Sequence, residues 1–183
     1  MSFLASKAQL RASLIRWSLF LVPLMVLLGF MAGKLGSPET LWFQSLVKPS
    51  IFPPPITFGI VWTLLYIMIG FAVALVASSW GAFGRRLALI LFAFHFVFNL
   101  AWTPVFFGGQ NIIGGLIVIG IVDLTLLAVL WAFWRVRRTA AYLLLPYLAW
   151  VLFATFLNYQ FLVENPDGGI QSDASESTQR FEI

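Results

Sequence analysis

The sequence predicts an all-α integral membrane protein, a bundle of five transmembrane helices with a long loop between the first two. Hydrophobic residues make up 61% of the 183 and charged residues only 10%, and the mean hydropathy is +0.93. A soluble domain carries about 25% charged residues. The charges also gather in short clusters between apolar runs, each near the roughly 20 residues that a helix needs to cross the hydrocarbon core.

The first span is expected at 14–33, after an N-terminus that carries Lys7, Arg11 and Arg16. A cleaved signal peptide shares this pattern, but its apolar core is only about 7–15 residues long. The run here is longer and its cleavage signal is weak, so we predict a retained helix. The connector 34–54 follows. It is longer than connections in compact domains usually are, so we expect a functional lid.

The remaining spans are expected at 55–79, 85–107, 111–134 and 140–162. Pro55 opens the second span, and proline is well tolerated at a first helical position. Residues 1–163 would then form a single transmembrane domain. Residues 164–183 are polar, and we expect them to form a disordered tail.

Five spans place the two chain ends on opposite sides of the bilayer, and the charges then separate. One side carries basic residues and no acid: Lys7, Arg11, Arg16, Arg85, Arg86, Arg135, Arg137 and Arg138. The other carries Lys34, Lys48 and Arg180 with six acids, Glu39, Glu164, Asp167, Asp173, Glu176 and Glu182. Because basic residues in short loops stay inside, we expect a cytoplasmic N-terminus and an outer C-terminus, in a bacterial cell membrane. This topology also accounts for the pI of 9.9 without a nucleic-acid partner.

The composition narrows the chemistry. The chain has no Cys and one His, which excludes disulfides, thiolate catalysis and a multi-histidine metal site. We find no nucleophile–base pair and no nucleotide-binding loop. The sequence therefore assigns no catalytic residue, no metal site and no obligatory cofactor.

Aromatic and polar residues recur at helical spacing in three spans. The stripes are Phe58, Trp62, Tyr66 and Gly70; His95, Asn99, Trp102 and Phe106; and Pro146, Trp150, Ala154 and Asn158. Residues three or four apart are neighbours on a helix surface, so each set predicts one face. A ligand cavity and ordinary packing with interfacial aromatic belts are alternatives on pattern alone. Belts suit Trp17, Trp80, Trp131 and Trp134, which lie near the basic residues.

Two ionisable residues lie at similar depth in adjacent spans. His95 falls in the third and Asp123 in the fourth, where an acid costs about 2.5–3.5 kcal/mol on insertion scales. Because a tight turn makes these spans antiparallel neighbours, we expect an intramembrane polar pair. The alternative is that Asp123 is protonated or bonded to a backbone group.

Four motifs follow one another along the chain: LWFQSLVKPS at 41–50, VWTLLY at 61–66, NLAWTPVFFG at 99–108 and PYLAW at 146–150 with LNY at 157–159. Together they resemble the TspO/translocator-protein family, also called tryptophan-rich sensory protein or peripheral-type benzodiazepine receptor. Three departures stand out: His95 replaces a usual Gln, Phe43 a common Tyr, and no Lys or Arg follows Tyr159 within five residues. The last removes the basic end of the sterol pattern.

The resemblance implies a membrane receptor, transport or sensing protein that binds porphyrins, haem or protoporphyrin IX, and other hydrophobic ligands inside the bundle. Carried over by motif, the ligand-binding residues are Trp42, Phe43, Trp62, Tyr66, Asn99, Trp102, Trp150, Ala154 and Asn158. Since these coincide with the three stripes, we favour a cavity over plain packing. The alternative function is an enzyme that promotes light- or oxygen-dependent tetrapyrrole degradation, and a channel or proton-coupled transporter is a weaker third.

The resemblance also suggests a homodimer. Small residues let membrane helices approach closely, and Gly29 with Gly33 forms a G-x-x-x-G in the first span. Gly114, Gly115 and Gly120 offer a second face in the fourth span. The alternative is that these glycines serve packing within one bundle.

Overall fold

The computed structural model describes residues 7–168, and within this range it contains helices and no strand. The elements are α1 (Lys7–Lys34), α2 (Leu41–Ser45), α3 (Pro55–Ala77), α4 (Arg85–Thr103), the π-helical turn η1 (Pro104–Gly108), α5 (Ile112–Val136) and α6 (Arg138–Glu164). Five helices, with η1 continuing α4, are long and apolar enough to cross a membrane. The predicted five-helix membrane bundle is confirmed, and the chain is an integral multi-pass membrane protein.

The observed helices extend beyond the apolar runs. α1 begins at Lys7 rather than near residue 14, and α6 runs from Arg138 to Glu164 rather than from 140 to 162. Helical hydrogen bonding does not stop where apolar residues stop, so hydropathy marks only the part of a helix that lies in hydrocarbon. Of the polar tail expected after residue 163, the part from residue 169 onward lies outside the described residues.

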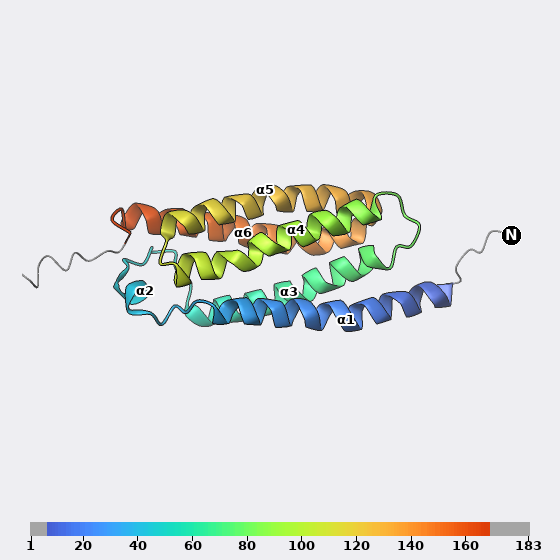
Figure 1. Cartoon of the computed structure of the whole chain (residues 1–183), viewed down its shortest axis with the longest axis horizontal. Helices are drawn as coiled ribbons and strands as arrows, with labels where there is room; N and C mark the ends of the chain where they lie inside the picture. The colour runs from blue at the N-terminus through green and yellow to red at the C-terminus, as the bar shows by residue number, and fades with distance from the viewer. Residues whose placement is uncertain (1–6, 169–183) are drawn as a thin grey trace, which may run out of the picture.

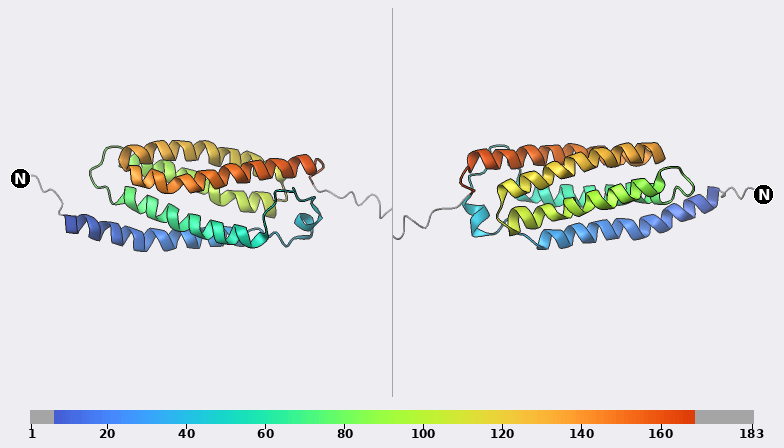
Figure 2. Two further views of the ribbon diagram at one scale, coloured as in Figure 1. Left: turned by 180° about the vertical axis from the view of Figure 1, so that it is seen from behind. Right: turned by 45° about the horizontal axis from the view of Figure 1, so that its top comes forward.

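Successive long helices run antiparallel along the long axis of the bundle (Figure 1). α1 packs mainly on α3, α3 also packs on α6, and α5 packs on both α4 and α6. Figure 2 shows α1 at one edge of the bundle, beside α3. Gly70 permits this approach, because a Cβ there would lie 2.6 Å from the Cα of Val22.

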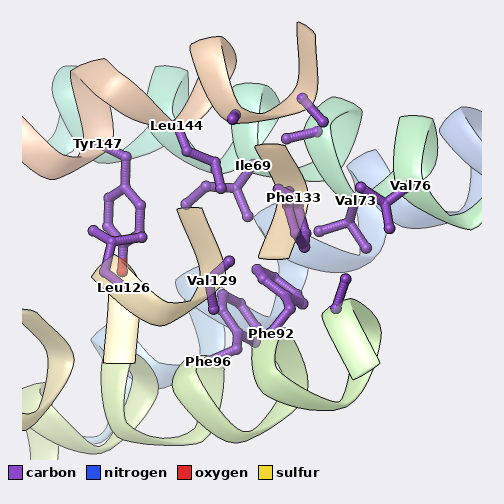
Figure 3. Close-up of a cluster of buried hydrophobic side chains, with 14 of the residues drawn as sticks. Ile69, Val73, Val76, Phe92, Phe96, Leu126, Val129, Phe133, Leu144 and Tyr147 are labelled. Carbon is purple, nitrogen blue, oxygen red and sulfur yellow. The ribbon is translucent and has the colours of Figure 1, made fainter. Parts of the chain in front are cut away.

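The four helices other than α1 supply most of the bundle interior. Figure 3 shows Ile69 and Val73 of α3, Phe92 of α4, Phe133 of α5 and Leu144 of α6 packed against one another. Lipid tails are as apolar as these side chains, so close packing rather than expulsion from water favours their association. α3 is the most enclosed helix in this packing, since residues 72–78 are all buried.

The start of α1, the connection from α3 to α4 and the turn between α5 and α6 share one end of the bundle (Figure 1). We call this the basic end, because its charged residues are the arginines of the predicted basic side. Its aromatic residues hold the loops in place. Trp80 donates from Nε1 to Ser13 Oγ at 3.2 Å, and the Arg85 guanidinium lies 4.1 Å from the Trp80 ring centre. The α2 connection, η1 and the end of α6 lie at the opposite end.

Candidate functional site: an aromatic cluster on a buried polar chain

The connection 35–54 is folded at its centre. Thr40 caps α2, since its hydroxyl accepts from the Phe43 N–H at 3.3 Å. Lys48 closes the other end, because its Nζ donates to the carbonyls of Phe43, Gln44 at 3.2 Å and Leu46 at 2.8 Å. Burial lowers the pKa of the Lys48 ammonium. A short helix is thus fixed by its own flanking residues.

Hydrogen bonds tie this connection to the end of α6. The Asn165 side chain accepts from Val47 N at 2.8 Å and donates to Val47 O at 3.0 Å. It also donates to Phe161 O at 2.9 Å. Trp42 Nε1 donates to Gly168 O at 2.9 Å. The connection therefore lies across the end of the bundle opposite the basic end.

Aromatic rings fill the space beneath the connection. The Phe43 ring is 5% exposed and lies 5.0 Å from Phe107 and 5.6 Å from Phe161, centre to centre. Trp42 meets Phe106 edge to face at 5.7 Å. Trp102 stacks on Phe106 at 4.9 Å with 16° between the planes. Rings from the connection, α4, η1 and α6 thus form one cluster.

The π-helical turn η1 turns two successive phenylalanines into this cluster. Pro104 has no N–H to donate, which interrupts the α-helical ladder. Gly109 N then donates to Pro104 O at 2.8 Å and Asn111 N to Phe106 O at 3.2 Å, both five residues apart. The wider turn accommodates Phe106 and Phe107, whose rings lie 4.9 Å apart. Single π-turns of this kind are frequent at functional sites.

The three predicted stripes converge. Trp62 of α3 stacks on Tyr66 at 5.4 Å, and Trp150 of α6 meets Phe58 of α3 edge to face at 5.8 Å. Trp102 of α4 donates from Nε1 to Asn158 Oδ1 of α6 at 3.1 Å. The predicted residues of α3, α4 and α6 are therefore neighbours in space.

Parts of the stripes point elsewhere. Gly70 faces α1, as described above, and Pro146 is exposed. Ala154 is half-buried and packs on the core. Asn158 is 2% exposed and satisfied on both sides, because its Nδ2 donates to Ile112 O at 3.1 Å. The Trp150 Nε1 is buried and has no hydrogen-bond partner among the described residues.

Below the aromatic cluster, polar groups of four helices are linked one to the next. The Tyr66 hydroxyl donates to Asn99 Oδ1 at 3.2 Å, and Asn99 Nδ2 donates to the Tyr147 hydroxyl at 2.8 Å. Tyr147 in turn lies 3.0 Å from His95 Nε2, and His95 Nδ1 lies 2.9 Å from Thr125 Oγ1. We call these five residues the polar chain.

The hydrogen-bond partners determine which atom donates and which accepts at each link of the polar chain. The Thr125 hydroxyl donates to the carbonyl of Ile121 at 2.7 Å, so its oxygen accepts from His95 Nδ1–H. The neutral imidazole then presents Nε2 as an acceptor, and it accepts from Tyr147. Every donor points the same way, from α3 to α4, on to α6, back to α4 and finally to α5.

A sequence profile of the TspO/MBR family matches residues 20–163, which include α2, α3, α4 and α5 and every predicted site residue. The chain belongs to the TspO/MBR family. It is 38% identical to the tryptophan-rich protein TspO of Chlorobaculum tepidum over 148 residues, 79% of this chain and 93% of the relative. It is 37% identical to the tryptophan-rich sensory protein of Cereibacter sphaeroides, over 79% of this chain and 89% of that one. The Homo sapiens translocator protein is 38% identical over 64% of this chain and 71% of its own length. The resemblance inferred from the motifs is confirmed.

In this TspO/MBR chain the expected pairing of His95 with Asp123 is wrong. Both His95 nitrogens are occupied by Thr125 and Tyr147. Asp123 Oδ2 accepts from Thr155 Oγ1 at 2.8 Å, and its Oδ1 has no partner among the described residues. The prediction rested on the similar depth of the two residues in adjacent spans. On α5, however, Thr125 meets α4 whereas Asp123 meets α6.

Three residues of the candidate site were not predicted from the sequence. Tyr147 is the central member of the polar chain, and Thr125 ends it. Asn165 fixes the connection to α6. A usable signal existed for Tyr147, which stands at i, i+4, i+7 and i+11 with Val151, Ala154 and Asn158. Thr125 and Asn165 carry no periodic signal.

Proposed function

We propose that this TspO/MBR protein binds a porphyrin, haem or protoporphyrin IX, among the aromatic side chains of α3, α4 and α6 beneath the 35–54 connection. We further propose that it acts as a membrane receptor, transport or sensory protein and that the connection serves as its lid. The names of two relatives, a sensory protein and a translocator protein, agree with this class of role.

Trp150 carries the proposal. Its indole lies between Phe58 at 5.8 Å and Phe153 at 5.3 Å, yet its buried N–H has no partner among the described residues. An unmet buried donor costs about 1–3 kcal/mol. A ligand that stacks on the ring and accepts this hydrogen through a carbonyl or carboxylate oxygen would remove that cost.

The other site residues fit a flat macrocycle. The half-buried rings of Trp62 and Trp102 offer aromatic faces for stacking. Lys48 is the one basic residue of the connection 35–54. Its Nζ already donates to three backbone carbonyls, so a porphyrin carboxylate would have to replace one of them. A ligand that stacked on the face of Trp102 now covered by Phe106 would have to displace that ring, which lies 4.9 Å away.

Two predicted ligand contacts have other tasks. The amides of Asn99 and Asn158 already bond Tyr66, Tyr147 and Trp102, so they position rings. His95 is the only histidine of the chain, and both its nitrogens bond protein groups. The site therefore favours recognition of the macrocycle over ligation of haem iron.

The test compares two conservative tryptophan changes. Trp150→Phe removes the unpaired N–H and part of the stacking area, so porphyrin affinity should fall about five- to a hundredfold, equivalent to about 1–3 kcal/mol. Ala154→Leu should weaken binding by filling the site. The matched control is Trp134→Phe at the basic end, where affinity should not change. Quenching of Trp fluorescence by haem and by metal-free protoporphyrin IX gives the affinities.

Equal losses for Trp150→Phe and Trp134→Phe, or no loss in either with both variants folded, contradict the proposed site. The two porphyrins should bind with similar affinity, since recognition is by the ring. Mass spectrometry of the pigment after incubation in light and in darkness tests the degradation alternative. A new covalent product formed only with protein present would favour it.

A further inference from the structure

A shallow apolar groove lies between α5 and α6 at the basic end, far along the bundle from the aromatic cluster. Its volume is about 230 Å³, and its lining residues are Leu130, Trp131, Trp134, Ala141, Tyr142 and Leu145. These belong to the last turns of α5 and the first turns of α6. Trp131 is 52% exposed and Leu145 48%, so the groove opens toward the surrounding lipid.

Arginines stand over the tryptophans of this groove. The Arg135 guanidinium lies 4.4 Å from the Trp131 ring centre, and that of Arg138 lies 5.5 Å from Trp134. Tyr142 meets the Trp134 ring edge to face at 5.2 Å, which holds that ring as one wall. The groove therefore combines apolar walls, which include the two tryptophan rings, with the guanidinium groups that lie over those rings.

No acid among the described residues at this end neutralises the positive charge. The described segments there, 7–20, 78–91 and 130–145, contain no Asp or Glu. The first turn of α6 has no acid either, and its N-cap Arg137 makes no side-chain cap. The positive dipole end of α6 is offset by the negative end of α5, which ends at Val136 beside it, so the arginines supply the positive charge of the groove. An occupant of the groove must be apolar along its length and anionic at its head.

We propose that this groove binds one anionic phospholipid, with an acyl chain between α5 and α6 and the phosphate against Arg135 and Arg138. The seven residue steps from Arg138 to Leu145 rise about 10 Å along the helix, so the groove leads from headgroup level into the hydrocarbon. Basic pockets between transmembrane helices are known to hold anionic headgroups. The site is independent of the proposed porphyrin site.

An interfacial aromatic belt would use the same residue types without a specific seat for a lipid. It predicts that all arginines on this side attract anionic lipid equally. The groove instead singles out Arg135 and Arg138, whose guanidinium groups lie over its tryptophans. Arg11 and Arg16 are likewise exposed but lie on α1. These four arginines therefore provide both the test and its matched control.

The experiment is native mass spectrometry of the full chain in detergent, titrated with phosphatidylglycerol or phosphatidylcholine of identical acyl chains. Phosphatidylglycerol should give a single saturable adduct at lower concentration. Arg135→Gln/Arg138→Gln should weaken it about thirtyfold, since each arginine near the surface contributes about fivefold. Leu145→Trp should also weaken it, because the larger side chain fills the groove and leaves the charges in place.

Arg11→Gln/Arg16→Gln removes the same charge on the same side and should leave the affinity unchanged. Equal retention of both lipids overturns the proposal, and so do equal losses in the two double variants. Binding that survives Leu145→Trp overturns the placement of the acyl chain. Far-UV circular dichroism checks the helix content of each variant. Should Arg135→Gln/Arg138→Gln fail to fold, Leu145→Trp decides alone.

Discussion

Tyr147 of α6 joins two polar groups of α4 through one hydroxyl. It is 1% exposed, accepts from Asn99 and donates to His95. In a low-dielectric interior such a network strengthens its members, and a missing member leaves the others unpaired at high cost. The phenol oxygen thereby fixes the rotation of an amide on one side and of an imidazole on the other.

Tyr147→Phe should therefore destabilise the bundle although it keeps the ring. The change leaves Asn99 Nδ2 and His95 Nε2 unpaired, and a buried unsatisfied group costs about 1–3 kcal/mol. Thermal unfolding in detergent measures the effect. Tyr142→Phe is the control, because Tyr142 is 54% exposed and should tolerate the change. Equal melting temperatures for the two variants would contradict the central role of Tyr147.

Helical geometry explains which site residues the sequence could predict. Each residue turns about 100°, so steps of four drift by about 40°. A stripe of three such steps, from Pro146 to Asn158, therefore spans about 120°, and its first member is exposed. Spacing of i, i+4, i+7 and i+11 stays within about 60°. The stripe from His95 to Phe106 has this spacing and faces inward throughout.

The length of each secondary-structure element determined whether it could be predicted from the sequence. The five long helices carry 18 or more residues of apolar sequence, which hydropathy detects directly. α2 and η1 have five residues each, too few for a periodic signal. Each of these elements depends on a single residue, the Thr40 cap for α2 and Pro104 for η1. The contacts that each element then makes are to residues distant in sequence.

Asn165→Ala should release the 35–54 connection without unfolding the bundle. The side chain supplies both hydrogen bonds to Val47, each worth about 0.5–1.5 kcal/mol. Hydrogen exchange at the Val47 amide should accelerate about tenfold, which corresponds to about 1.4 kcal/mol. Mass spectrometry of labelled peptides that cover the connection measures it.

Asn111→Ala is the matched control for this experiment. Asn111 caps α5 through Gly114 N at 2.7 Å, and within the described part of the chain it makes no hydrogen bond to the connection. Its loss should speed exchange at the start of α5 alone. If the two variants expose the same peptides, Asn165 does not hold the connection specifically.

For the whole molecule, the separation of charge between the two ends predicts an orientation. The basic end carries arginines and no acid, so it should face the cytoplasm. A C-terminal reporter that is active only outside should then be active, and the same reporter at the N-terminus should be silent. Activity at the N-terminus alone would invert the orientation.

Association of two copies is the second whole-molecule prediction. A Cβ at Gly29 would collide with Tyr66, whereas Gly33 and Gly120 have open space around them. Only the latter two are free to meet another helix closely, so we predict that cross-linking in membranes traps a dimer. Gly33→Leu or Gly120→Leu should weaken it, depending on which face is used. Monomer alone, at every protein density, would contradict the dimer.

The contact between Gly29 and Tyr66 also gives α1 an influence that its residues do not suggest. α1 adds no member to the polar chain, yet Tyr66, the first member, rests against its backbone. Tilting is one way in which a transmembrane helix accommodates a bilayer thinner or thicker than its hydrophobic length. We therefore expect this contact to carry changes in the surrounding lipid to the interior of the protein.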